Sequence, residues 1–294
     1  MIKKIWSAAV LFLLNKASKT IKLKLIISII FLVFIHAACF SQNSKRWGMD
    51  KNGGISWNVK ADTGHTDHIE MSGLQVSAII TYGISANGEL ILSRKLVYPM
   101  LRTIPNNTHA SLIEEYKDHN LLKILVNDKV VTEKPESFSI KGNLVISSKT
   151  NTQVEIKRTI FPSVNKPALV EIIELKNTGA NACSVNITNG FPVIKTDTSK
   201  GVYGEYVVAA QATDSGTHTI PAGDTYTFSV AYAGRKLCEE KYSYSADYEW
   251  KKRQQFINEI FSNLVLETPN DTINREFAFA KLRTTESIYD TKAV

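Results

Sequence analysis

The sequence predicts a mainly β protein, a large antiparallel β-sandwich (supersandwich) followed by two C-terminal helices. Short runs of alternating apolar and polar residues recur between residues 55 and 232, and turn residues separate them. After about residue 246 the apolar residues recur every three or four positions, as in helices. The chain has 294 residues, 44% of them hydrophobic, so it holds enough apolar material for a large core.

Residues 1–41 have the pattern of an export signal. Lysines precede an apolar run at residues 25–40 (LIISIIFLVFIHAACF), and polar sequence follows it. The run is shorter than the ~20 residues that a membrane span needs. We therefore expect cleavage after Ser41 and a periplasmic or secreted protein, and we call residues 42–294 the mature chain. An uncleaved anchor, or a lipid on Cys39, would instead attach the protein to a membrane.

The positive charge of the whole chain comes from this N-terminal segment. The formal net charge is +7, but residues 1–41 hold six lysines and no acidic residue, which leaves 29 basic and 28 acidic residues. A nucleic-acid-binding protein needs a clustered surplus of Lys and Arg. The mature chain has no such cluster, so nucleic acid is excluded as a partner.

The strands are predicted from alternation and from the turns between them. Asn87-Gly88, Asn127-Asp128 and Lys141-Gly142-Asn143 are turn signals. The predicted strands are residues 55–59, 74–82, 89–97, 123–126, 137–140, 144–146, 154–161, 168–175, 182–187 and 225–232.

Two helices are predicted near the C-terminus. The first covers residues 246–266 with an apolar face, and residues 251–254 lie mostly off that face. Thr268-Pro269 ends it, and Asn270 or Asp271 can cap a second helix that runs to about Tyr289. Apolar residues surround most of this second helix, which is typical of a helix buried by other helices.

Several segments together resemble the N-terminal region of a known enzyme family. They are Arg158–Pro162 (RTIFP), Ala168–Glu171 (ALVE), Leu175–Gly179 (LKNTG), Pro221–Asp224 (PAGD), and the run from Glu267-Thr-Pro269 through Phe277–Lys281 to Glu286–Ile288. This set resembles the β-sandwich, linker and first barrel helix of the six-hairpin, or (α/α)6-barrel, glycoside hydrolases, over roughly residues 45–290.

The resemblance implies four parts and a carbohydrate-related function. They are a signal at 1–41, a β-sandwich at 42–245, a linker helix at 246–269 and the first helix of a truncated barrel at 270–294. The acid and base carboxylates of that family lie in the barrel, so no catalytic residue is carried over to this chain. The resemblance thus implies a non-catalytic portion of a glycosidase that shapes the glycan cleft and seats the barrel. The missing barrel could be a separate chain. A premature stop near Lys292 or a gene fragment would explain the truncation.

Two functions from other classes stay open. The first is a free-standing carbohydrate-binding or cell-surface module, and the second is an assembly protein whose terminal helix docks on a partner. The sequence has no Gly-rich phosphate loop, no G-x-S-x-G elbow and no zinc-type Cys spacing, so no cofactor is predicted. Cys183 and Cys238 could pair or stay free thiols.

The densest polar cluster contains His65, Asp67, His68 and Glu70. In a strand, successive side chains point to opposite faces, so His65 and Asp67 would face one way and His68 and Glu70 the other. This arrangement disfavours a metal site. Imidazole and carboxylate groups can instead hydrogen-bond sugar hydroxyls while Trp57 or Tyr82 stacks on a sugar ring. The alternative is a polar turn whose side chains bond to nearby backbone.

A second polar cluster lies at residues 98–109. Its candidate ligand-binding residues are Arg102, Asn106, Asn107 and His109. Two prolines and two asparagines predict a loop rather than a helix or a central strand. The loop could line a glycan cleft or brace the barrel, or it could be a crossover whose Asn side chains cap turns.

Overall fold

The computed structural model describes residues 46–60, 63–104, 110–117 and 122–291. Met1–Arg46 and Trp47–Val294 form separate compact units, and only the second is described below. The predicted signal segment, Cys39, Asn106, Asn107 and His109 lie outside the described residues. In the described part of the chain, no helix combines the length and apolar character that a membrane crossing requires.

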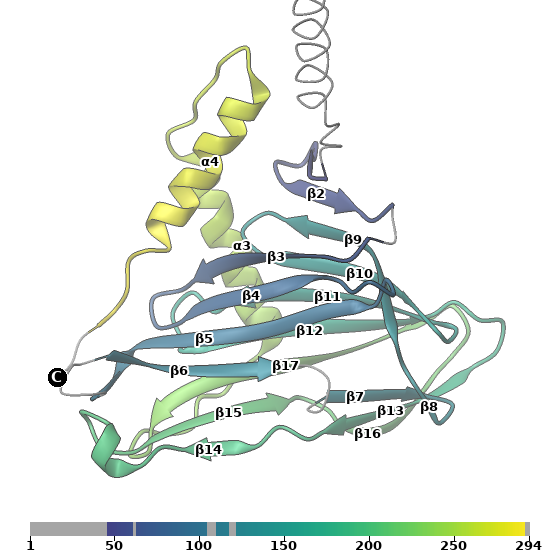
Figure 1. Cartoon of the computed structure of the whole chain (residues 1–294), viewed down its shortest axis with the longest axis horizontal. Coiled ribbons are helices and arrows are strands. Elements are labelled where there is room, and N and C mark those ends of the chain that lie inside the picture. The colour runs from purple at the N-terminus through teal and green to yellow at the C-terminus, as the bar shows by residue number, and fades with distance from the viewer. Residues whose placement is uncertain (1–45, 61–62, 105–109, 118–121, 292–294) are drawn as a thin grey trace, which may run out of the picture. The chain divides into compact units, whose positions relative to one another are not determined.

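The fold is mainly β, as predicted, and is built from three antiparallel sheets (Figure 1). The largest has nine strands in the order β1-β2-β9-β10-β11-β12-β17-β15-β14. A four-stranded sheet, β3-β4-β5-β6, packs on its inner face, and a second one has the order β16-β13-β7-β8. All three contribute side chains to one hydrophobic core.

The strand bounds are as follows: β1 Gly48–Met49, β2 Ile55–Asn58, β3 His65–Ser72, β4 Ser77–Ile84, β5 Leu90–Thr103, β6 Ala110–Lys117, β7 Leu122–Val126, β8 Lys129–Val130, β9 Glu133–Ile140, β10 Leu144–Thr150, β11 Val154–Pro162, β12 Ala168–Asn177, β13 Cys183–Asn189, β14 Val193–Lys195, β15 Tyr206–Ala212, β16 Gly216–Ile220 and β17 Thr225–Lys236. A short 3-10 turn, η2, covers Thr198–Lys200. The helices are α3, Ala246–Ser262, and α4, Asp271–Thr285.

Buried charge connects the two stacked sheets. Arg94 of β5 donates to Glu171 of β12 at 2.5 Å, and Arg158 of β11 donates to the other oxygen of Glu171 at 2.7 Å. Arg158 also binds Glu133 of β9, and the Tyr232 hydroxyl donates to Glu171 at 3.1 Å. We call these five residues the core arginine cluster. Because burying an unpaired charge is very costly, each charge here has an opposite partner.

Three expectations for the sheets were wrong. Residues 65–72 form the regular strand β3, so the polar-turn interpretation fails there. Strand β5 continues through Pro99 to Thr103, because a register shift between Tyr98 and Arg102 accommodates the proline. The strands β1, β3, β6, β8, β14, β15 and β16 were not among the predicted strands.

The helix predictions were right in type and inaccurate in detail. Helix α3 ends at Ser262 and α4 ends at Thr285, both earlier than expected. The Asn270 side chain caps α4, as predicted. Arg253, expected off the buried face of α3, is fully buried, and Leu282 is the buried residue of α4. The other apolar residues of α4 are at most partly buried in the described chain, so the expected burial of this helix by further helices stays a prediction.

The two cysteines of the sandwich are free thiols. Cys183 is buried in β13, whereas Cys238 is exposed after β17. The disulfide considered from sequence is therefore absent from this structure.

Candidate functional site

The inward half of the first predicted cluster forms a small polar and aromatic group. His65 Nε2 lies 3.1 Å from Asp67 Oδ1, and the Trp47 indole N–H donates to Asp67 Oδ2 at 3.1 Å. Both side chains of β3 are partly exposed, at 29% and 33%. The Asp67 carboxylate is thus already bound on both oxygens, which leaves fewer free acceptor positions for a sugar hydroxyl.

Aromatic rings surround this pair. Trp57 stacks on Phe138 with ring centroids 4.8 Å apart, and it meets the His65 ring edge-on at 5.6 Å. Tyr82 packs on Phe138 as well, and its burial raises the pKa of its hydroxyl, with the Asp67 charge adding to the effect. Trp57 and Tyr82 are core residues, so they are not free to stack on a ligand in this conformation.

The other half of the cluster faces away, as the alternation predicted. His68 and Glu70 are exposed, while His65, Asp67 and Met71 point inward. The Ser77 hydroxyl donates to Glu70 at 2.6 Å, and the Glu70 carbonyl accepts from Arg283 in the last turn of α4. The four predicted residues therefore do not converge, and no group of three or more potential metal ligands occurs in the described ranges.

Arg102 lies far from this first cluster. Register places His65 opposite Ile84 and Ile84 opposite Leu90, so His65 is level with the start of β5. Arg102 is twelve residues further along β5, and because of the register shift after Tyr98 this corresponds to roughly 30 Å along the sheet. Its carbonyl accepts from the Tyr206 hydroxyl at 2.5 Å. His65 and Arg102 therefore cannot contact one sugar ring together.

The acidic residues of β3 and β6 do not form a facing pair of the glycosidase type. Burial raises the pKa of Glu114, the direction needed for a general acid. Its neighbour Glu115 follows it directly in β6, so the two side chains point to opposite faces. Asp67 and Glu70 are separated by the same alternation.

A buried polar junction between the helices and the sandwich was not predicted from the sequence. Arg253 of α3 donates to the Gly142 carbonyl at 2.6 and 3.0 Å and to the Ser72 carbonyl at 3.0 Å. It also binds the buried carboxylate of Glu286, which follows α4 and accepts from Arg283 at 2.5 Å. We call Arg253, Glu286, Ser72 and Gly142 the helix joint. It ties both helices to two turns of the sandwich, and burial lowers the pKa of Arg253.

Further contacts hold α3 along the outer face of β11 and β12. Glu249 accepts from the Ser163 hydroxyl at 2.7 Å and pairs with Lys166 at 2.9 Å. Trp250 packs on Phe161 with ring centroids 5.0 Å apart. The buried residues of α3 are Glu249, Arg253 and Ile257, a spacing of four. Two of them are charged, so hydrophobic periodicity carried no signal for this face.

Helix α4 is fixed at both ends. The Arg275 side chain donates to the Asp50 carbonyl, and the Tyr289 hydroxyl lies 3.1 Å from the Ser72 hydroxyl. Lys281 donates to the Ile260 carbonyl at 2.7 Å and to neighbouring carbonyls at the end of α3. This ammonium satisfies carbonyls that a helix end leaves without intrahelical partners.

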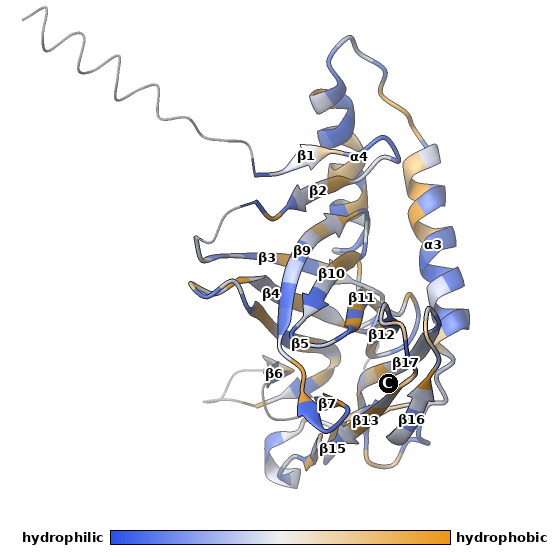
Figure 2. Cartoon of the chain, turned by 90° about the vertical axis from the view of Figure 1, so that its right-hand side faces the viewer, coloured by the Kyte–Doolittle hydropathy of each residue, from blue (hydrophilic) through white to orange (hydrophobic). Residues whose placement is uncertain are grey.

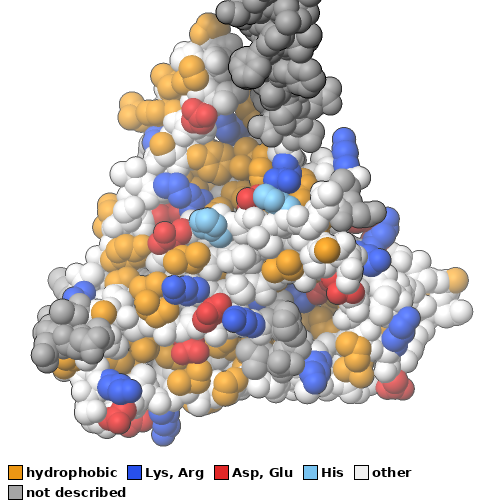
Figure 3. All heavy atoms as spheres, viewed as in Figure 1, with side chains coloured by type: hydrophobic (Ala, Val, Ile, Leu, Met, Phe, Trp, Pro, Cys, Tyr) orange, Lys and Arg blue, Asp and Glu red, His pale blue; other side chains and the backbone are white. Residues whose placement is uncertain are grey.

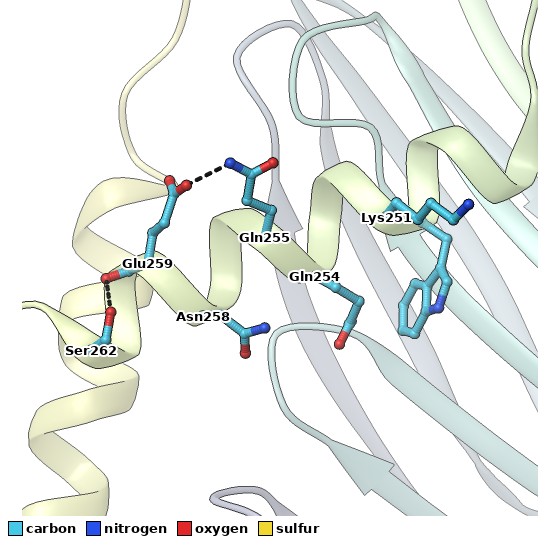
Figure 4. A pocket seen from close by; sticks show the side chains of 7 residues that line it. Lys251, Gln254, Gln255, Asn258, Glu259 and Ser262 are labelled. Atoms are coloured by element: carbon cyan, nitrogen blue, oxygen red, sulfur yellow. Dashed lines mark hydrogen bonds between the residues drawn. The ribbon is translucent and has the colours of Figure 1, made fainter.

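Several apolar residues in and next to the helix pair are exposed to solvent. Figure 2 shows an apolar run where α3 ends and continues toward α4, and Figure 3 shows apolar side chains at the surface of the α4 region. Leu264 is 77% exposed, Val265 61%, Ile273 47% and Ile288 62%. The solvent side of α3 is different, a shallow hollow lined mainly by polar side chains such as Gln254, Gln255 and Asn258 (Figure 4). Of these exposed apolar residues, Leu264 and Val265 lie in the loop between the helices, Ile273 lies in the first turn of α4 and Ile288 follows α4.

Comparisons with known proteins give likenesses to solved structures and no match at the level of sequence. No protein-family model matches the sequence, and no curated protein matches it. Among solved structures, the chain is similar to a protein from human microbiome that carries the provisional name kojibiose phosphorylase, with a TM-score of 0.49 and 11% identity. The match covers 82% of this chain and 42% of that protein, so the chain spans less than half of its length. A likeness at this level assigns neither a family nor an activity.

Proposed function

We propose that this chain is an exported, non-catalytic β-sandwich portion of a glycan-processing enzyme of the six-hairpin class. In this proposal α3 and α4 form the seat on which a helical barrel packs. The barrel carries the catalytic carboxylates, and the sandwich shapes one wall of the glycan cleft. The glycan class rests on the resemblance of Arg158–Pro162 and the later segments to that family.

The observation that carries the seating role is the contrast between the buried attachment of the helices and the exposed apolar residues next to their ends. Arg253 is fully buried and joins α3, Glu286 and two segments of the sandwich. Leu264 and Val265, in the loop between the helices, and Ile288, after α4, are largely exposed. Because the helices are already fixed on the sandwich, little ordering entropy is lost when a partner binds these residues.

The positions of the acidic side chains of β3 and β6 support the non-catalytic role. Asp67 and Glu70 point to opposite faces of β3, and the same holds for Glu114 and Glu115 of β6. A glycosidase needs two carboxyls about 5–10 Å apart across one sugar. We expect the purified mature chain to release no product from a panel of oligosaccharides, with or without inorganic phosphate. Turnover that a Glu70→Ala change abolishes would contradict the proposal.

The seating role is tested with the rest of the gene. Sequencing past codon 294 in all frames should recover a helical reading frame, and its product should co-purify with the mature chain. Ile288→Asp should weaken this association at least tenfold, because it places a charge in an apolar interface. Val130→Asp on β8 is the matched control, since Val130 is 59% exposed against 62% for Ile288. An equal loss of affinity in both variants, or no loss in either, would overturn the seating role.

A free-standing carbohydrate-binding module is the second candidate function. The group of Trp47, His65 and Asp67 at the sandwich surface favours it, because indole and imidazole groups beside a carboxylate suit sugar recognition. Glycan-array binding at micromolar affinity that His65→Ala removes would support it. Binding that survives His65→Ala would count against this surface.

A further inference from the structure

Two neighbouring hollows lie on the outer face of the nine-stranded sheet, away from every residue predicted from sequence. One has a volume of about 480 Å³ and the other about 360 Å³. The segment Lys241–Tyr244, which leads into α3, borders both, and they share Gln211 and Ala231. Their volumes fall in the range of about 300–1,000 Å³ that small-molecule sites usually occupy.

The floor of the larger hollow is made of small side chains. Ala209 of β15 and Ala231 and Ala233 of β17 line it together with Ala210, while Tyr232, between the two alanines of β17, points into the core. A floor of alanines lets a flat ring approach the sheet closely. Tyr242 and Tyr244 line the walls, and such rings offer an apolar face together with a hydroxyl for hydrogen bonding.

The charge of the lining has one sign. Lys241 borders both hollows and Arg235 borders the larger, and neither hollow is lined by an Asp or Glu. Arg235 Nη1 also donates to the carbonyls of Leu237 and Glu239, so it holds the segment before Lys241 in place. The mature chain is almost neutral overall, so this local cationic lining favours an anionic ligand.

A buried hydroxyl group in the wall of the larger hollow supports a polar ligand. The Tyr244 hydroxyl is buried and makes no hydrogen bond with any described residue. Buried polar groups normally have partners, and a ligand oxygen is one such partner.

We propose that these hollows bind a short segment of an anionic glycan. Its sugar rings lie on Tyr242 and Tyr244 over the alanine floor, and its carboxylate or sulfate group pairs with Lys241. The glycan class rests on the proposed function, whereas the site and its preference for negative charge rest on the lining alone.

Isothermal titration of the mature chain with three trisaccharides tests this inference. The probes are a galacturonic acid trimer, a sulfated galactose trimer and a neutral galactose trimer, all at low salt. We expect one or both anionic probes to bind at least tenfold more tightly than the neutral one, and which of the two binds identifies carboxylate or sulfate as the group recognised. Equal affinities for all three, or no binding of any, would overturn the proposal.

Matched variants localise the binding. Lys241→Glu should weaken anionic binding about tenfold, equivalent to ~1.4 kcal/mol, and Tyr242→Ala should weaken every probe that binds. Tyr248 and Lys252 form a similar exposed pair on α3, so Tyr248→Ala and Lys252→Glu are controls that should leave binding unchanged. Equal losses in variants and controls would contradict the site. Ile288→Asp tests seating alone, so failure of the barrel to associate and failure of glycan binding are distinguishable.

Discussion

Two buried arginine centres hold the molecule together, and they differ in what the guanidinium groups contact. In the core arginine cluster, Arg94 and Arg158 share the carboxylate of Glu171, and Glu133 supplies a second negative charge. In the helix joint, Arg253 meets one carboxylate, Glu286, and otherwise binds the carbonyls of Ser72 and Gly142. The first is a network of side chains between two sheets. The second is a set of hydrogen bonds from one side chain to backbone carbonyls of two separate segments.

This difference predicts that the core arginine cluster contributes to the stability of the whole sandwich, whereas the helix joint attaches the two helices to it. The core arginine cluster joins β5, β9, β11 and β12, so its loss affects both stacked sheets at once. The helix joint joins α3 and the end of α4 to two turns, so its loss affects mainly the attachment of the helices. Replacing a complete buried ion pair by apolar residues is often neutral, but removing one partner is strongly destabilising. Single substitutions in each centre therefore reveal what that centre holds together.

The largest expected effect comes from Glu171→Gln. It leaves Arg94 and Arg158 buried with one fewer negative charge, which should lower the free energy of unfolding by about 3–5 kcal/mol. Urea unfolding followed by tryptophan fluorescence measures this. Glu174→Gln is the control, because its pair with Lys157 is partly exposed and should contribute less than ~1 kcal/mol. Similar midpoints for the two variants would break the distinction between buried and surface pairs.

The next effect concerns Arg253→Met. It leaves the Glu286 carboxylate buried without Arg253 and should weaken helix attachment by about 3–5 kcal/mol. Hydrogen exchange should accelerate in α3 and α4 while the amides of β11 and β12 stay protected. Lys252 is one residue earlier and exposed, so Lys252→Met should change the exchange rates of neither the helices nor the two strands. If helices and sheets exchange faster together, the two regions form one cooperative unit and the comparison fails.

Much of the sandwich was predictable because alternation and turn chemistry are local. The Ser85–Glu89 turn occurs as expected, with Gly88 at a φ of 74°, and the opposite orientations of Asp67 and Glu70 followed from strand geometry alone. Strand β5 was shortened in the prediction because Pro99 suggested a break, whereas a register shift absorbs it.

The helix joint and the hollows beside β15 and β17 were not predictable, because they depend on contacts between distant segments. From the sequence, Arg253 is expected at the surface. Its burial depends on the carbonyls of Ser72 and Gly142, which are more than a hundred residues away in the chain. The alanines at 209, 231 and 233 become a floor only when β15 pairs with β17. Of the predicted site residues, only His65 and Asp67 contact each other in the described ranges.

A smaller loss of stability is expected from a substitution at Gly142, where the helix joint contacts the turn between β9 and β10. Gly142 has a φ of 75°, and a Cβ there would lie 2.7 Å from the Ile257 side chain of α3. Gly88 has nearly the same φ of 74° with no atom near its Cβ position. Both Gly→Ala variants share the left-handed backbone cost of roughly 1–2 kcal/mol. Gly142→Ala should lose ~1–3 kcal/mol more through overpacking, measured by urea unfolding. Equal losses would mean that α3 moves away freely and that the joint is loose.

The smallest effect is expected in a third charged cluster, at the surface. The Tyr226 hydroxyl donates to Asp214, and His218 lies 3.2 Å from that hydroxyl and 3.6 Å from the carboxylate. The hydrogen bond from Tyr226 is the main cause that lowers the pKa of Asp214 below its ordinary value of 3.8. A depressed folded-state pKa contributes stability at neutral pH that is lost only as the pH falls through that value. Tyr226→Phe should therefore return the pKa of Asp214 toward 3.8 in a carboxyl NMR titration and leave the urea midpoint at pH 7 nearly unchanged, because surface pairs contribute little. A loss as large as that of Glu171→Gln would show that exposure does not decide the contribution of charged clusters in this fold.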